Sequence, residues 1–106
     1  GTNDADMVLA GNTVRKNKGG LAFALNGQVV GELPLPVAGL MSTESAETVE
    51  EKLQALKAAL KAHGISEDID VFMTLAFVSL PVIPKLRLNT YGIVDVDAQR
   101  IVPAVF

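Results

Sequence analysis

The stretch LAFALNGQVVGEL, residues 21–33, decides the fold because it encodes a β-hairpin. Two apolar segments flank Asn26 and Gly27, the dipeptide best suited to the two positive-φ positions of a type I′ turn. Such a turn contains two residues, so Leu25 should lie opposite Gln28 and the two segments should pair as antiparallel strands. The hairpin is therefore the starting point of a mainly antiparallel sheet.

Two amphipathic helices are expected, one on either side of this hairpin along the chain. The first should run from Ala5 to about Lys18, with Asp4 as its N-cap and the glycines at 19–20 as its end. The second has acidic residues early, basic residues late and an apolar stripe that should be buried in the core. The stripe consists of Val49, Leu53, Leu56 and Leu60.

The rest of the chain favours extended structure. Pro34 and Pro36 each remove a backbone donor, so residues 33–37 should leave the sheet. The nearly continuous apolar run 71–80 predicts a buried strand, although a short buried helix has the same pattern. Later strands are expected at 85–88, 93–96 and 101–106, with a turn at 89–92. The predicted fold class is α+β, with two helices packed on a mainly antiparallel sheet of five or six strands and one Asn-Gly hairpin.

Length and composition favour one soluble domain over residues 1–106. A chain of 106 residues, 49% hydrophobic and 20% charged, can build a single core and is too apolar for disorder. The net charge of −3 offers no cationic excess for nucleic acid, and the longest apolar run is too short to span a membrane. The chain starts at Gly1 without a signal segment, so it looks like a fragment.

The counts of cysteine and histidine restrict the chemistry further. The absence of cysteine excludes a disulfide framework and a thiolate nucleophile, and it fits an intracellular origin. Metal sites built from several imidazoles are excluded because His63 is the only histidine. His63 could act as a general base, but its place in the last turn of the second helix favours a structural role as a cation near the helix end.

Paired aspartates are the remaining candidates for chemistry. Asp95 and Asp97 stand two apart on an expected strand and should point to the same face, as a general acid–base pair or a magnesium site requires. A solvent-facing pair is the favoured alternative, because the sequence shows no third metal ligand or neighbouring base to accompany the two carboxylates. Two further pairs lie near expected helix ends or turns, where capping explains them: Asp4 with Asp6, and Asp68 with Asp70. The residues alone predict no self-contained active site.

Several strings together resemble one protein family. They are GTNDADM at 1–7, ELPLPVAGLMS at 32–42, FMTLAF at 72–77, LPVIP at 80–84 and GIVDV at 92–96. In this order and spacing they are similar to the C-terminal domain of the bacterial adenine deaminases of the amidohydrolase superfamily, which are distinct from adenosine deaminase. The resemblance runs nearly from end to end, so the chain is expected to correspond to most of that domain.

The resemblance implies that the parent enzyme hydrolyses adenine to hypoxanthine and ammonia in purine salvage, with a metal-bound hydroxide in an upstream (β/α)8 barrel. It implies a divalent metal, manganese or iron, held by barrel histidines and an aspartate that this chain does not contain. The implied partners are that barrel and further copies in a homo-oligomer, and the implied location is the cytoplasm. The isolated chain is expected to be inactive, with no catalytic and no metal-ligating residue.

The segment 72–77 has competing roles. Its side chains could reach the barrel mouth and exclude water from the purine, or they could pack on the barrel or another subunit; packing is favoured because apolar runs are mostly core. The candidates are Phe72, Met73, Thr74 and Phe77. An independent small-molecule-binding or oligomerisation module without catalysis is the alternative. Because the family carries a preceding strand that this sequence lacks, the chain should expose an apolar patch or strand edge over 72–84 and self-associate.

Overall fold

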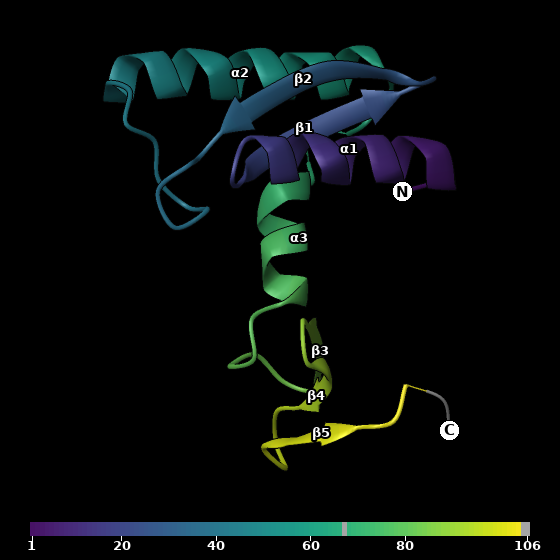
Figure 1. Cartoon of the computed structure of the whole chain (residues 1–106). Coiled ribbons are helices and arrows are strands. Elements are labelled where there is room, and N and C mark those ends of the chain that lie inside the picture. The colour runs from purple at the N-terminus through teal and green to yellow at the C-terminus, as the bar shows by residue number, and fades with distance from the viewer. Residues whose placement is uncertain (67, 105–106) are drawn as a thin grey trace. The chain divides into compact units, whose positions relative to one another are not determined.

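The computed structural model describes residues 1–66 and 68–104, which fall into two compact units, Gly1–Ser66 and Glu67–Phe106 (Figure 1). In chain order the elements are α1 (Asp4–Lys16), β1 (Gly20–Leu25), β2 (Gln28–Pro34), α2 (Ala46–Ala62), α3 (Val71–Val78), β3 (Leu86–Asn89), β4 (Gly92–Asp95) and β5 (Arg100–Val102). The predicted α+β class is confirmed. The predicted single sheet with two helices is wrong, because the described residues form three helices and separate antiparallel sheets of two and three strands.

Helix α1 begins one residue earlier than predicted, because Asn3 rather than Asp4 is its N-cap. The side-chain oxygen of Asn3 accepts a hydrogen bond from the amide of Asp6 at 2.8 Å, which satisfies one of the free amides of the first turn. The helix also ends earlier than predicted, at Lys16, and Lys18 already has a left-handed φ of 61°.

The predicted hairpin is confirmed in β1 and β2. Leu25 pairs with Gln28, and the turn residues Asn26 and Gly27 have φ angles of 52° and 75°. Both angles are positive, as a type I′ turn requires. The paired region extends further than predicted, to Pro34 at the end of β2, a position where the missing proline amide disturbs the ladder least.

The core of Gly1–Ser66 lies between the hairpin and its helices, with α1 packed on both strands and α2 packed on β2 (Figure 1). Leu33, Leu56 and Leu60 are its buried apolar residues. Helix α2 approaches β2 closely at Gly31, where an added Cβ would lie 2.7 Å from Cδ1 of Leu56. The predicted stripe of α2 is therefore buried at Leu56 and Leu60, while its other two members are half-buried.

The prediction of a buried strand over residues 71–80 is wrong, because Val71–Val78 form helix α3. The side chain of Asp70 caps the helix by accepting a hydrogen bond from the amide of Met73 at 2.9 Å, and Ser79 is the C-cap. None of the described strands pairs with this segment. A helix satisfies its backbone groups internally, whereas a strand needs a neighbour to do so.

The late strands form a three-stranded antiparallel sheet in the order β3-β4-β5. Asn89 pairs with Gly92, so the predicted turn at 89–92 is confirmed, and the side chain of Asn89 accepts a hydrogen bond from the amide of Tyr91 at 2.8 Å. The third strand covers Arg100–Val102 instead of 101–106. The last two residues of that prediction, 105 and 106, lie outside the described residues.

Candidate functional site

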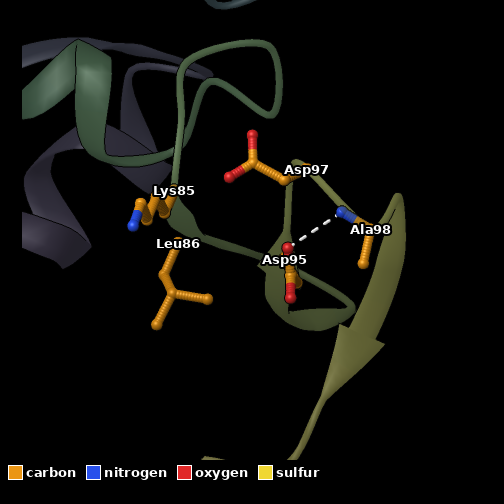
Figure 2. Close-up of a pocket in the computed structure, with 5 residues that line it drawn as sticks. All are labelled: Lys85, Leu86, Asp95, Asp97 and Ala98. Atoms are coloured by element: carbon orange, nitrogen blue, oxygen red, sulfur yellow. Dashed lines mark hydrogen bonds between the residues drawn. The ribbon is translucent and has the colours of Figure 1, made fainter.

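An open hollow of about 550 Å³ lies beside the late strands (Figure 2). Its lining consists of Lys85, Leu86, Asp95, Asp97 and Ala98. One carboxylate oxygen of Asp95 accepts a hydrogen bond from the amide of Ala98 at 3.0 Å, which stabilises the turn between β4 and β5. The carboxylates of Asp95 and Asp97 point in different directions (Figure 2).

The predicted placement of Asp95 and Asp97 on one face of a strand is wrong. Strand β4 ends at Asp95, so Asp97 lies in the following turn, where the alternation of a strand no longer applies. Asp97 is exposed to solvent and Asp95 serves the turn. The favoured alternative, a solvent-facing pair, therefore agrees with Asp97 alone, because Asp95 is half-buried.

The positions of the described metal-ligating side chains decide whether this chain can hold a metal ion. Across residues 1–66 and 68–104, histidine, cysteine, aspartate and glutamate do not gather in groups of three or more that could hold a metal ion. A divalent metal in an enzyme is held by several such ligands. The described residues therefore offer no ligand set for a divalent metal.

Helix α3 presents the four residues proposed from the sequence on an almost wholly apolar helix. Its sequence VFMTLAFV has no charge, and the helix has no buried residue. Met73 is 53% exposed and Phe77 is 46% exposed, while Phe72 is half-buried. A helix that is apolar on all sides is ordinarily found in a buried environment. The roles of Phe72, Met73, Thr74 and Phe77 stay predictions.

The carboxylate of Asp6 is a feature that the sequence reasoning missed. Asp6 lies on α1 and is 9% exposed. Its Oδ1 accepts a hydrogen bond from the amide of Gly27 at 2.8 Å, and its Oδ2 accepts hydrogen bonds from the amide of Asn26 at 3.0 Å and from Nδ2 of Asn3 at 2.8 Å. Asp6 thus ties the first turn of α1 to the turn of the hairpin.

These hydrogen bonds favour the charged form of the carboxyl group. The bond from the Asn3 side chain is the largest cause that lowers the pKa of Asp6, and the Gly27 amide is the next; burial opposes them and the Asn26 amide adds to them. The capping interpretation of Asp6 from the sequence was wrong because the capping side chain belongs to Asn3. Spacing along the chain could not place a carboxylate against a turn twenty residues away.

Two other titratable residues considered from the sequence, His63 and Asp70, have structural roles at helix ends. His63 is the C-cap of α2, and its ring centroid lies 5.8 Å from that of Phe23. The structural interpretation of His63 agrees with this position. Asp70 is the N-cap of α3, which agrees with the capping interpretation of this residue.

A tight apolar turn at 37–41 was also missed by the sequence reasoning. Val37 and Met41 form an isolated bridge, and Ala38 and Gly39 have φ angles of 55° and 75°. Leu40 is 78% exposed at the tip of this turn. The sequence predicted only an irregular segment here, because the bridge depends on the local path of the chain after two prolines.

None of the described helices has the length and apolar character needed to cross a membrane.

Comparison with known proteins identifies relatives for nearly the whole chain. The family described as adenine deaminase C-terminal domain matches residues 1–100. Adenine deaminase 2 of Carboxydothermus hydrogenoformans is 47% identical over 103 residues, which are 97% of this chain and 18% of that protein. The adenine deaminase of Kosmotoga olearia is 56% identical over 96 residues, or 91% of this chain and 16% of that protein. The adenine deaminase of Methanococcoides burtonii is 45% identical over 105 residues, or 99% of this chain. The chain thus spans less than a fifth of the length of the relatives from Carboxydothermus and Kosmotoga.

Proposed function

Because this chain belongs to the adenine deaminase C-terminal domain family, we propose that it serves as the C-terminal domain of an adenine deaminase. The parent reaction is the hydrolysis of adenine: water adds to the carbon that bears the amino group, that carbon–nitrogen bond breaks, and hypoxanthine and ammonia leave. The observation that carries the proposal is the family match over residues 1–100, which the named relatives support at 45–56% identity.

In this proposal the chain is structural and the chemistry belongs to the upstream part of the enzyme. We place the divalent metal, manganese or iron, in an upstream barrel, because most of the length of the named relatives lies outside the part that this chain matches. Residues 1–106 act as one domain of that enzyme, correspond to most of its C-terminal domain and pack against the barrel. We place the enzyme in the cytoplasm, in keeping with a chain that has no cysteine.

Helix α3 is the proposed contact with the rest of the parent enzyme. It carries no charge, so a partner would have to cover it with apolar side chains. The relative from Carboxydothermus contains this region as only 18% of its length, so most of such an enzyme lies outside it and can supply the cover. Phe72, Met73, Thr74 and Phe77 would then lie between domains, or at the edge of the substrate site if the barrel mouth faces them.

The experiment that tests this function uses the adenine deaminase of Kosmotoga olearia, which is 56% identical to this chain over 96 residues. We expect three results: the enzyme without the matched segment loses activity or stability, the same enzyme with this chain in its place regains it, and the chain alone releases no ammonia from adenine, with or without added manganese. Ammonia release and thermal unfolding are the measurements. Full activity and stability of the shortened enzyme would contradict a role for this domain, and turnover by the chain alone would contradict a purely structural one.

A further inference from the structure

The hairpin turn contains the one Asn-Gly pair of the chain, at Asn26 and Gly27. In such pairs the backbone nitrogen of the glycine can attack the side-chain carboxamide of the asparagine, because glycine has no side chain to obstruct the approach. The other asparagines are followed by larger residues: Asn3, Asn12, Asn17 and Asn89. By sequence alone, Asn26 is the position in this chain most prone to spontaneous deamidation.

In the structure, the attacking nitrogen is engaged in a hydrogen bond with the carboxylate of Asp6. The Gly27 N–H donates its hydrogen bond to Oδ1 of Asp6 at 2.8 Å, and the Asn26 N–H donates to Oδ2 at 3.0 Å. Attack on the Asn26 side chain requires the Gly27 nitrogen to lose its proton and to leave this hydrogen bond. The carboxylate opposes both steps, because it binds the proton and places a negative charge beside the amide anion that would form.

We propose that Asn26 is a latent deamidation site that the carboxylate of Asp6 keeps closed while the chain is folded. When the contact opens, the Gly27 nitrogen forms a bond to Cγ of Asn26, the bond from Cγ to the side-chain nitrogen breaks, and ammonia leaves with the proton of the amide. A five-membered succinimide remains. Water then opens this ring at one of its two carbonyl groups, which yields aspartate or isoaspartate at position 26.

Either product would prevent the contact with Asp6 from forming again in its native geometry. Aspartate at position 26 adds a negative charge next to the carboxylate of Asp6. Isoaspartate adds one carbon to the backbone of a two-residue turn, which displaces the pairing of Leu25 with Gln28. The reaction therefore converts a transient opening of the turn into a permanent loss of the tie between α1 and the hairpin.

The test incubates the 106-residue chain at mildly alkaline pH, with and without urea, and measures deamidation at each asparagine by peptide mapping and mass spectrometry. We expect Asn26 to react fastest in urea and to be slowed about tenfold or more in the native chain, the scale of one hydrogen bond to a charged group. Asp6→Asn should remove most of this protection, and Asp4→Asn, an exposed neighbour on the same helix turn, should leave it unchanged. Asn26→Asp provides the reference for the product.

Circular dichroism on each sample separates loss of the contact from loss of the fold. If Asp6→Asn does not fold, Asp6→Glu keeps the charge but changes the distance to the turn, and it should show intermediate protection. A native chain in which Asn26 reacts as fast as in urea would overturn the proposal. A folded Asp6→Asn or Asp6→Glu chain with the same slow rate as the original chain would overturn it as well.

Discussion

At the scale of the residue, the charge on Asp6 links the stability of Gly1–Ser66 to pH. The hydrogen bonds of Asn3 and of the turn amides lower the pKa of Asp6 below the ordinary 3.8. Because the pKa of Asp6 is lower in the folded chain than in the unfolded chain, the unfolded chain binds more protons at pH values near and between these two pKa values. The stabilisation is therefore complete above the ordinary pKa and is lost as the pH falls through the folded-state pKa. Glu47, whose pKa is lowered by its own backbone amide and by Ser45, acts with the same sign.

The first prediction follows from this sign. Asp6→Asn should lower the free energy of unfolding near neutral pH and should flatten its decline below about pH 4, because the titrating group is gone. Urea denaturation followed by circular dichroism at several pH values measures this slope. Asp4→Asn serves as the matched control, since Asp4 is exposed on the same helix turn. An identical acid slope in Asp6→Asn and the original chain would show that Asp6 does not carry the effect, and the contribution of Glu47 cancels in the comparison.

Gly31 gives the second prediction at this scale. An added Cβ would lie 2.7 Å from Cδ1 of the buried Leu56, so Gly31→Ala should destabilise the chain by about 1–3 kcal/mol through overpacking. Gly11 on α1 is the control, because a Cβ there meets no atom within 4 Å. Gly11→Ala should stabilise the chain by about 0.5–1 kcal/mol, since alanine favours a helix. Equal effects of the two substitutions in chemical denaturation would contradict the close contact of α2 with β2.

At the scale of the element, the hairpin could be predicted and α3 could not, for a physical reason. The Asn26-Gly27 turn is specified by the φ preferences of two adjacent residues, which the sequence displays directly. Whether an apolar run becomes a strand or a helix depends on whether another strand is available to pair with it, and that strand is formed by residues distant in the sequence. The contact of Asp6 with the turn was missed for the same reason, because only the packing of α1 on β1 brings it there.

Helix α3 gives the third prediction. In the Kosmotoga enzyme that carries this chain, Phe77→Ala should lower stability by about 3 kcal/mol, the scale of truncating a buried phenylalanine, and should leave the KM for adenine unchanged. Tyr91→Ala truncates another aromatic ring of the same unit, one that is 80% exposed, and should change stability by less than about 0.5 kcal/mol. A raised KM with unchanged stability would instead place Phe77 at the substrate.

At the scale of the whole molecule, the exposed apolar residues of the second unit give the fourth prediction. Leu75 is 61% exposed and Val82 is 72% exposed, which leaves apolar surface without cover in the described residues. The chain separated from an upstream partner should therefore self-associate at micromolar concentration, and Leu75→Asp should weaken that association. Analytical ultracentrifugation measures both. A chain that is monomeric throughout this range would contradict this prediction.

The contacts within Gly1–Ser66 also determine how fast this part of the chain acquires its structure. The packed elements α1, β1, β2 and α2 follow one another directly along the chain, so the loops that folding must close are short. Such low contact order is typical of domains that fold within about milliseconds. A ribosome adds about 5–20 residues per second, so the residues after Ser66 take seconds to be made. Gly1–Ser66 can therefore reach its native arrangement during translation. It does so before the apolar segment of α3 is available to pair incorrectly, as an extended strand, with the apolar strand β1.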